Sequence, residues 1–441
     1  SLFFLFTMPA DTDALLLHLQ TFGASRSAEL QKALGKSQST VSRLLAQLPG
    51  QVLTLGQGKS ARYALPQPIA GGAAQQPLWR VDSAGRAQPL GLLSLLARDQ
   101  IHIEAPGLDV LGTTGLPWYL SPLQAQGFLG RLLAQSLAGY GVPGNPDHWD
   151  LQATLTAALH LHDAPGALVL GHLHAATALP TLPPPGPDLG QALDTLAENI
   201  HSTLPAGASI GGDQPKFLAT NHLGRPVLVK FSPPRGTPFG ERWHDLLHAE
   251  ALCLQVLQSY GQQVAACEVV HSHNRTYLVS QRFDRTGNAG RQHVVSVGAA
   301  HAAFVPGGYQ HWAATCDALA RQGRLSADGA QQALFRLQFG RLVGNTGMHA
   351  DNLALFAQGD SLKDIAKGRF ALAPVYDMLP LRYQPDAHTG GLDYAAFATD
   401  GFWANATSMA AARQFWSLLA EQPQVSPALQ VLARNMVQSA A

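Results

Sequence analysis

The segment NTGMHADN, residues 345–352, is the most informative stretch of this 441-residue chain. It follows an apolar helical pattern, ALFRLQFGRLV (333–343), which ends at Gly344, a residue typical of a helix C-cap. A short strand pattern comes next (LALF, 353–356), and a second one (RFALAPV, 369–375) leads into the acidic turn YDMLP, 376–380. We expect the polar loop and the acidic turn to carry the chemistry.

This order of elements is typical of a protein-kinase catalytic loop followed by its metal-binding aspartate. Asn352 and Asp377 are the candidate Mg²⁺ ligands, because Mg²⁺ prefers hard oxygen atoms and bridges nucleotide phosphates. Taken singly, each residue also has a simpler explanation, Asn352 as a loop cap and Asp377 as a turn residue.

A glycine-containing loop precedes these elements by more than a hundred residues. It reads SIGGDQPK (209–216) and leads into the strand patterns FLAT (217–220) and VLVKF (227–231). Glycines let backbone N–H groups approach a phosphate, so the loop is a candidate nucleotide cover. It lacks the GxxxxGK[ST] pattern and is therefore not a Walker P-loop.

Lys230 lies inside the apolar strand pattern, where a lysine is costly unless it is paired or used. An amphipathic helix pattern some twenty residues later (HDLLHAEALCLQVL, 244–257) carries Glu250. A strand lysine paired with a helix glutamate is how protein kinases hold nucleotide phosphates. Two simpler explanations are open: an edge-strand lysine that points to water, and a solvated glutamate. RTYLVSQRFDR (275–285) predicts a strand and a hinge between two lobes.

Together these motifs resemble the HipA family, serine/threonine kinases of bacterial toxin–antitoxin systems. The resemblance covers roughly residues 80–435 and rests on SIGGDQPKF, VLVKF, HAEALCL, VSQRFDR, GNTGMHADN and PVYDMLP. It implies an α+β, bilobal protein-kinase-like (HipA-like) fold that uses ATP and Mg²⁺ and phosphorylates a protein hydroxyl. Some members act on an aminoacyl-tRNA synthetase, so a protein of the translation machinery is the implied substrate class.

The resemblance also assigns roles to individual residues. Ser209 stands at the family's autophosphorylated serine, Lys230 at the nucleotide lysine, and Asn352 and Asp377 at the metal ligands. The implied ATP-binding set is Ser209, Gly211, Gly212, Lys216, Lys230 and Glu250.

One position departs from the family. Its loop resembles N-x-D-x-H-x-x-N, with the catalytic aspartate five residues before the metal-binding asparagine, and here that position is Gly347. A carboxylate in this role typically contributes ~10²–10⁴-fold to the rate. Asp351 and His349 are the remaining candidate proton acceptors, but Asp351 adjoins a metal ligand and His349 also fits a structural role. We therefore expect ATP–Mg²⁺ binding with weak phosphoryl transfer.

Residues 1–68 predict a winged helix-turn-helix domain. An apolar stripe of helical spacing begins at Leu15, a second helix runs from near Ser27 to Gly35, and a third follows Ser37. QVLTLGQGKSARYAL (51–65) predicts two strands joined by a Gly-Gln-Gly-Lys turn. Residues 1–7 are expected to lie upstream of a natural start at Met8.

This first domain is basic, with six lysines and arginines against three acidic residues. We expect it to bind double-stranded DNA through the third helix and the wing, although a winged helix can also serve protein contacts alone. The candidate DNA-binding residues are Lys36, Gln38, Ser39, Ser42, Arg43, Lys59 and Arg62. Six basic residues are few, so a homodimer is expected.

A winged helix on the same chain is similar to the YjjJ-like subgroup of the family. In better-known relatives a separate HipB-like antitoxin makes most of the DNA contacts. The remaining domains are expected at 79–180 (HipA N-terminal-like α/β subdomain), 189–300 (kinase N-lobe with the glycine-rich loop) and 301–441 (helical C-lobe with the catalytic loop), with Pro/Gly-rich linkers at 67–78 and 179–190.

The whole-chain composition is neutral, with 29 Lys+Arg against 29 Asp+Glu, 13% charged and 46% hydrophobic residues. These values exclude global disorder and a general nucleic-acid coat. Cys253, Cys267 and Cys316 form no paired framework, and no apolar run reaches membrane-spanning length, so a cytoplasmic protein without membrane contact is expected.

Two HxH pairs raise the question of zinc. They are His160 with His162 and His172 with His174. No carboxylate or cysteine completes a recognisable site, so we favour ordinary surface or half-buried histidines.

Three functions are consistent with the sequence. The leading one is a HipA-like protein kinase with a fused DNA-binding domain, weakened by Gly347. The second is a DNA-binding regulator whose kinase body only binds nucleotide, and the third is a small-molecule phosphotransferase.

Overall fold

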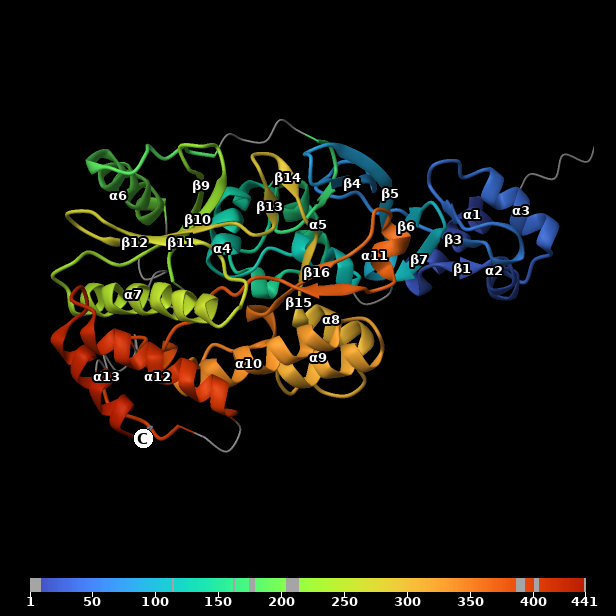
Figure 1. The fold of residues 1–441 in the computed structure, drawn as a ribbon. Helices are drawn as coiled ribbons and strands as arrows, with labels where there is room; N and C mark the ends of the chain where they lie inside the picture. Colours follow the sequence, from blue (N-terminus) through green and yellow to red (C-terminus); the bar gives the residue numbers. More distant parts are fainter. Residues whose placement is uncertain are drawn as a thin grey trace, which may run out of the picture.

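The computed structural model describes residues 9–112, 115–161, 163–173, 179–203, 214–385, 393–399 and 404–439. Along these residues the chain passes from an N-terminal module through a middle sheet to a smaller sheet and a helical lobe (Figure 1). All strand pairs within the named sheets are antiparallel in the described part of the chain.

The N-terminal module packs three helices against a small sheet of order β1-β3-β2. The helical stripe predicted from the sequence forms its core, with Leu15, Leu30 and Val41 fully buried. Gly35 ends the second helix in the left-handed region, as expected, and Ser37 caps the third. The elements are α1 (Pro9–Phe22), β1 (Ser25–Arg26), α2 (Ser27–Leu34), α3 (Gln38–Ala46), β2 (Leu53–Leu55) and β3 (Arg62–Ala64).

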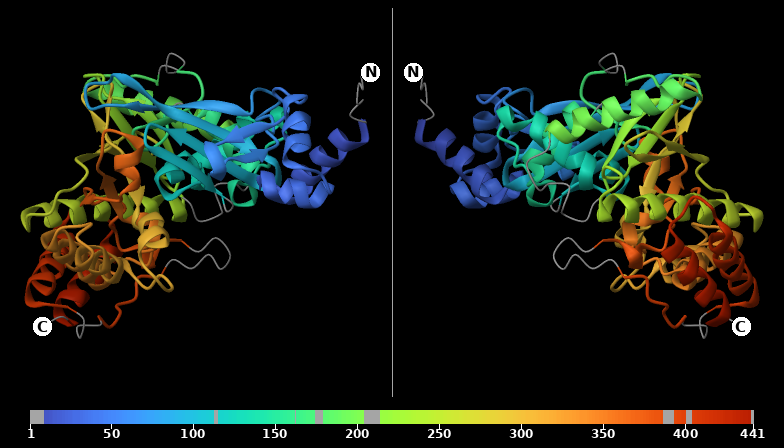
Figure 2. Two further views of the ribbon diagram at one scale, coloured as in Figure 1. Left: turned by 90° about the vertical axis from the view of Figure 1, so that its right-hand side faces the viewer. Right: turned by 90° about the vertical axis from the view of Figure 1, so that its left-hand side faces the viewer.

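The module projects from one end of the molecule and attaches to the middle sheet (Figure 2). Leu55 and Ala64 of the module form a small apolar cluster with Leu96. The backbone N–H of Ala24 donates to Gln100 Oε1 at 2.8 Å, which ties the end of the first helix to the same sheet.

The middle region is a five-stranded sheet of order β7-β6-β5-β4-β8. Its first hairpin turns at residues 82–86. The elements are β4 (Gln75–Val81), β5 (Ala87–Leu96), β6 (Gln100–Ala105), β7 (Leu108–Gly112), α4 (Gly127–Ser136), α5 (Leu151–His160) and β8 (Leu168–Leu170).

The next region is a four-stranded sheet of order β11-β12-β10-β9 between two helices (Figure 1). Successive side chains of β10 point to opposite faces of the sheet. Val227, Val229 and Phe231 belong to one core together with Leu193 of α6. Lys230 therefore points to the other face. The elements are α6 (Pro187–Thr203), β9 (Lys216–Thr220), β10 (Pro226–Phe231), α7 (Pro238–Ser259), β11 (Cys267–His271) and β12 (Thr276–Gln281).

A long helix, α7, separates this sheet from the helical lobe (Figure 1). It contacts β11 and β12 on one side and α12 on the other, and its residues belong to the largest core of the molecule. The remaining elements are β13 (Arg285–Thr286), β14 (Gly290–Arg291), β15 (Val294–Ser296), α8 (Val297–Phe304), α9 (Trp312–Arg321), α10 (Ala327–Val343), β16 (Ala354–Ala357), α11 (Leu362–Ala366), β17 (Phe370–Leu372), α12 (Ala406–Glu421) and α13 (Pro427–Ser439).

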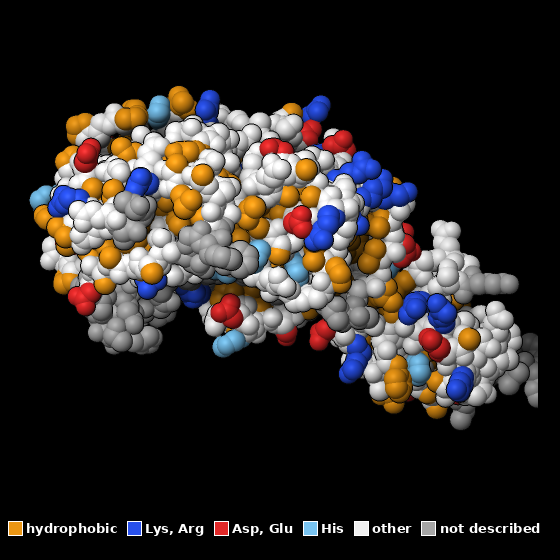
Figure 3. Space-filling view, turned by 60° about the horizontal axis from the view of Figure 1, so that its bottom comes forward, with side chains coloured by type: hydrophobic (Ala, Val, Ile, Leu, Met, Phe, Trp, Pro, Cys, Tyr) orange, Lys and Arg blue, Asp and Glu red, His pale blue; other side chains and the backbone are white. Residues whose placement is uncertain are grey.

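Charged side chains are sparse over the face in Figure 3, as expected from a chain with 13% charged residues. Within the part of the chain that the structure describes, no helix combines the length and apolar character needed to cross a membrane.

Candidate active site

Lys230 is a buried charge in the middle of the sheet. It lies on β10, which pairs with β9 and β12 on its two sides, and is 4% exposed. The edge-strand explanation is therefore excluded. Burial alone would lower the pKa of Lys230, but the carboxylates of Asp377 and Glu250 raise it above its ordinary value, so the ammonium stays charged.

Glu250 lies on α7, facing the sheet, and is 2% exposed. Its Oε1 accepts a hydrogen bond from Lys230 Nζ at 2.5 Å, whereas its Oε2 is buried and meets no hydrogen-bond partner among the described atoms. Burial raises the pKa of Glu250, and Lys230 only partly offsets this. A solvated surface glutamate is therefore excluded.

Asp377 is the second carboxylate on Lys230, and Lys230 Nζ donates to its Oδ1. Burial opposes ionisation of Asp377, but Lys230 and Lys216 outweigh it and hold the pKa of this carboxyl below its ordinary value. Its backbone lies in the left-handed region at φ 50°, which is uncommon for a residue with a side chain. Such strain concentrates at functional sites.

The strand register explains how Asn352 and Asp377 approach each other. β16 begins just after Asn352, β17 ends shortly before Asp377, and the two strands are antiparallel with Leu355 opposite Leu372. The start of β16 therefore lies beside the end of β17. Val375, two residues before Asp377, is also bonded to the segment 263–265. The backbone N–H of Ala265 donates to the Val375 carbonyl at 2.9 Å.

Asn345 joins the polar loop to the acidic turn. Its buried side chain donates from Nδ2 to the Asp377 carbonyl at 3.3 Å and accepts at Oδ1 from Gly347 N at 2.9 Å. Asn352 Nδ2 donates to the Gly347 carbonyl at 2.8 Å. A continuous chain of contacts thus runs from Asn352 through Gly347 and Asn345 to Asp377.

Gly347 is buried within this chain of contacts, and its backbone conformation does not require glycine. A Cβ placed on it would lie 2.7 Å from Leu381 Cδ2 and 3.4 Å from Asn345 Oδ1. The close neighbour is the end of a flexible side chain, so a Cβ at this position requires a shift of the Leu381 side chain and not of the backbone. The missing carboxylate is therefore not explained by backbone geometry.

The two other candidate proton acceptors lie around the short helix that follows Gly347. His349 is exposed, and its Nδ1 accepts from Asp351 N at 3.3 Å while its carbonyl accepts from Trp312 Nε1 at 2.8 Å. Asp351 is exposed, and its Oδ1 lies beside Gly298 of α8. His349 caps this turn, and Asp351 lies against α8 rather than in the Lys230 cluster.

Part of the predicted nucleotide site lies outside the described residues, namely Ser209, Gly211 and Gly212. Lys216, at the start of β9, is described. Its charge lowers the pKa of both Glu250 and Asp377, which places it near the cluster.

The candidate DNA-binding residues lie on the N-terminal module, far along the chain from the Lys230 cluster. Arg43 and its polar neighbours are exposed on α3, opposite the buried Val41 and Leu44. Lys36 forms an ion pair with Asp11 at 2.8 Å, and Arg62 on β3 is half-buried. The exposed set on α3 is Gln38, Ser39, Ser42 and Arg43. The side chain of Lys59 lies outside the described residues.

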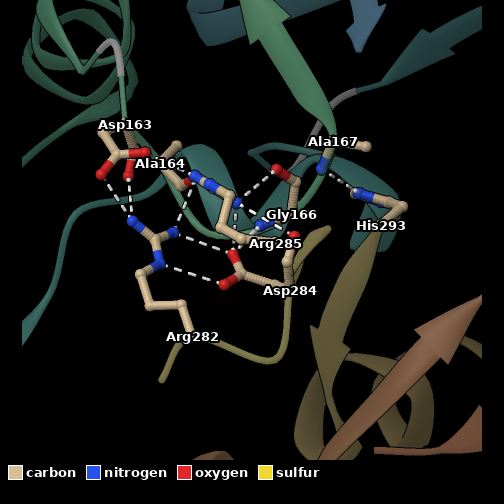
Figure 4. A network of polar contacts seen from close by, with 8 residues as sticks. All are labelled: Asp163, Ala164, Gly166, Ala167, Arg282, Asp284, Arg285 and His293. Carbon is tan, nitrogen blue, oxygen red and sulfur yellow. Dashed lines mark hydrogen bonds and ion pairs between the residues drawn. The ribbon is translucent and has the colours of Figure 1, made fainter. Parts of the chain in front are cut away.

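A second buried ion network holds the segment after β12 to the middle region (Figure 4). Arg282 donates to Asp163 at 2.5 Å and to Asp284, and Arg285 donates to the same two carboxylates at 2.6 Å each. Asp284 Oδ2 also accepts from Gly166 N at 2.9 Å. The predicted hinge is thus fastened to residues 163–166 of the middle region.

Sequence reasoning gave no role to Asn345, to this network or to a cluster of three histidines, His244, His248 and His271. The helical i, i+4 spacing of His244 and His248 was the available signal for that cluster. Of the two HxH pairs, His162 and His174 lie outside the described residues, and His160 Nδ1 bonds to the Thr156 carbonyl at 2.8 Å.

Comparison with known proteins places this geometry in a family. Residues 208–440 match the HipA-like C-terminal domain, and residues 72–179 match the middle domain of YjjJ-like toxins. The chain is 32% identical over 433 residues to Toxin YjjJ of Escherichia coli (strain K12), with 94% of each covered.

One solved structure of a HipA complex is similar in fold to this chain. HipA of Shewanella oneidensis MR-1, in a complex of HipA, HipB and operator DNA, aligns at a TM-score of 0.56 and 16% identity, covering 83% of this chain and 95% of that chain. The Helicobacter pylori proinflammatory kinase CtkA aligns at a TM-score of 0.34 and 10% identity, covering 51% and 89%.

The fold is therefore of the bilobal, kinase-like HipA class, as the sequence predicted. This chain belongs to the HipA-like family, in the group that carries the YjjJ-like toxin middle domain.

Proposed function

We propose that this protein binds ATP with Mg²⁺ beside Lys230 and transfers phosphate weakly to serine or threonine of a protein. The contact of buried Lys230 with buried Glu250 and half-buried Asp377 carries the proposal. In direct contact, one lysine meets two carboxylates, with Lys216 as a more distant positive charge, so the contacting groups carry a net negative charge that favours a divalent cation. Lys230 supplies a fixed ammonium for nucleotide phosphates, as the strand lysine of a kinase does.

Asn352 and Asp377 are the residues that would hold Mg²⁺. Their amide and carboxylate oxygens are the hard donors this ion prefers. Asn352 uses Nδ2 on the Gly347 carbonyl, which leaves Oδ1 as its metal-facing atom. When bound, Mg²⁺ would neutralise phosphate charge. Asn345 positions both segments, and Lys216 adds positive charge near the phosphates.

An ATP–Mg²⁺ titration followed by thermal denaturation tests this site. Ligand at 100 times its Kd stabilises the folded protein by about 2.7 kcal/mol. We expect a shift of this kind in the wild type, none in Asp377→Ala, and an unchanged shift in Asp317→Ala, which removes an exposed carboxylate on α9. Equal shifts in wild type and Asp377→Ala would reject the metal site.

The N-terminal module is proposed to be a winged helix that binds double-stranded DNA. The observation in its favour is the exposed polar face of α3, with Arg43 beside Gln38, Ser39 and Ser42. Several lysines and arginines are visible on the module in Figure 3. The HipA neighbour was solved with HipB and operator DNA, whereas this chain carries its own candidate DNA-binding module.

Binding to promoter DNA at several salt concentrations tests this assignment. Arg43→Ala is expected to weaken binding and to reduce the salt slope by about one if Arg43 contacts a phosphate. Arg321→Ala, which removes an exposed arginine on α9, serves as the control. Salt-independent binding, or equal binding by both variants, would contradict a phosphate-contacting helix.

DNA binding also defines a second candidate function, a regulator whose kinase-like body binds nucleotide without transferring phosphate. Gly347, which supplies no carboxylate, is the observation that favours it. One experiment distinguishes the weak kinase from the regulator, because labelled ATP marks a protein substrate only if phosphate is transferred. The E. coli relative is called a toxin, so we also propose that induced expression slows growth and that Lys230→Ala relieves this.

A further inference from the structure

Three histidines meet where α7 packs against the end of the β11–β12 hairpin. His244 and His248 are one helical turn apart on α7, and His271 is the last residue of β11. Their ring centroids are 4.8 Å (His244–His248), 5.0 Å (His248–His271) and 5.5 Å (His244–His271) apart. One nitrogen from each ring lies within 4.8 Å of the other two.

His248 has a buried nitrogen that the protein does not satisfy. The residue is 4% exposed, and its Nε2 has no hydrogen-bond partner among the described atoms. An unsatisfied buried polar atom costs about 1–3 kcal/mol. Burial, with smaller contributions from His244, His271 and Arg235, lowers the pKa of His248 to about 3, so the ring is neutral and keeps a lone pair. Neutral imidazole is the form that binds metals.

His244 already has the orienting bond that a metal ligand needs. Its Nε2 lies 2.5 Å from the Gln424 carbonyl, which can only accept, so Nε2 carries the proton. Its Nδ1 therefore accepts from the Thr276 hydroxyl at 2.6 Å. Thr276 pairs directly with His271 across the hairpin, so this Nδ1 faces the strand pair that carries the third histidine. Metal-binding histidines characteristically donate their other N–H to a carbonyl in this way.

From this arrangement we propose that His244, His248 and His271 form a binding site for a divalent transition-metal ion, with Zn²⁺ as the reference ion. Zn–N distances of about 2.0–2.1 Å in a tetrahedral site put ligand nitrogens about 3.3 Å apart. The rings have to approach by about 1.5 Å, with the Thr276 hydroxyl turning away from Nδ1. His271 is exposed, so the ion and a water ligand reach the site from solvent.

The surroundings allow a cation at this position. Arg235 is the nearby positive charge, and it is paired with Glu241 at 3.2 Å. The bound ion would connect α7, which carries Glu250, to the sheet that carries Lys230. The site uses none of the residues proposed for ATP and Mg²⁺, and it stands whether or not that proposal holds.

Zinc titration calorimetry on the full chain without a polyhistidine tag tests the proposal. We expect one Zn²⁺ per chain and an increase in thermal stability. His271→Ala, an exposed position whose loss should not unfold the protein, is expected to weaken binding by at least about tenfold, because even groups that only orient a metal ligand contribute about 10–100-fold.

Two control variants separate this site from others. His222→Ala removes an exposed histidine in the β9–β10 turn, and Asp377→Ala removes the proposed Mg²⁺ ligand. Both are expected to bind Zn²⁺ as the wild type does. Equal binding by wild type and His271→Ala would overturn the proposal, as would loss of binding in Asp377→Ala alone. If His271→Ala is unstable without metal, His271→Asn provides the same comparison.

Discussion

Two buried ion networks of this protein contain the same kinds of groups and are built differently. Around Lys230, one cation faces two carboxylates, a Glu250 oxygen lacks a donor among the described atoms, and Asp377 has a left-handed backbone. Around Asp284, two arginines form direct ion pairs with two carboxylates, a backbone N–H also donates to Asp284 (Figure 4), and Arg291 is a further positive charge close by. In its direct ion pairs the second network is balanced, and it holds regions together. The first is unbalanced, as a site that awaits a ligand should be.

The largest expected effect comes from restoring the carboxylate that is missing from the polar loop next to the first network. Gly347→Asp places a carboxylate where the family has one, and the close contact of its Cβ is with the flexible end of the Leu381 side chain. We expect phosphoryl transfer from labelled ATP to rise at least about tenfold, toward the ~10²–10⁴ range of a general base.

Gly347→Asn is the matched control, since it has the same shape without the charge. Both variants should keep the ATP–Mg²⁺ thermal shift if the fold is intact. Equal transfer by Gly347→Asp and Gly347→Asn would show that the loop does not present this position to the substrate.

A substitution in the network around Asp284 is expected to cause the largest loss in the free energy of unfolding. Asp284→Asn leaves two buried guanidinium groups with reduced charge compensation, and removing one partner of a buried ion pair costs about 3–5 kcal/mol. Chemical denaturation measures this. Asp317→Asn, in an exposed pair on α9, should cost less than about 1 kcal/mol. Similar losses in the two variants would remove the distinction between the buried and the exposed pair.

The corresponding change in the unbalanced network should be mild. Asp377→Asn leaves the Lys230–Glu250 pair intact, relieves repulsion between two carboxylates, and keeps a side chain that tolerates a left-handed backbone. We expect the free energy of unfolding to change by no more than about 1 kcal/mol, the centre of the range for point substitutions. A loss as large as that of Asp284→Asn would make the Lys230 cluster a structural network as well.

The sequence predicted those parts of the site that local patterns encode. A lysine in an apolar strand, a glutamate on an apolar helix and an aspartate after a strand are each visible from their neighbours, so Lys230, Glu250 and Asp377 were found. The order of these motifs indicated a kinase-like arrangement, and the resemblance to the HipA family added the HipA-like fold.

Apart from the Lys230–Glu250 pair, several contacts between distant segments were not predicted, because no local pattern indicates them. Asp163 and Arg282 are 119 residues apart in sequence and meet only after the middle region docks. Asn345 is polar like many loop residues, and its role follows from the register of β16 and β17, which brings the Asp377 carbonyl within its reach. His271 likewise reaches the two helix histidines only through the packing of α7 on the sheet.

The smallest expected effect is a difference in pH dependence between the two networks. The pKa of Glu250 is raised in the folded protein, so its ionisation disfavours folding, and this penalty disappears as the pH falls through the folded pKa toward its ordinary value of 4.5. The pKa of Asp284 is lowered, so its contribution is complete above 3.8 and is lost as the pH falls through the folded value.

Acidification from neutral pH to about 4.5 should therefore stabilise the wild type relative to Glu250→Gln and leave its difference from Asp284→Asn unchanged. Melting temperatures of the three proteins across this range, without nucleotide, measure the effect. A constant difference between wild type and Glu250→Gln would mean that Lys230 compensates the Glu250 charge fully. The first network would then be as balanced as the second, and the unpartnered oxygen would no longer indicate a ligand site.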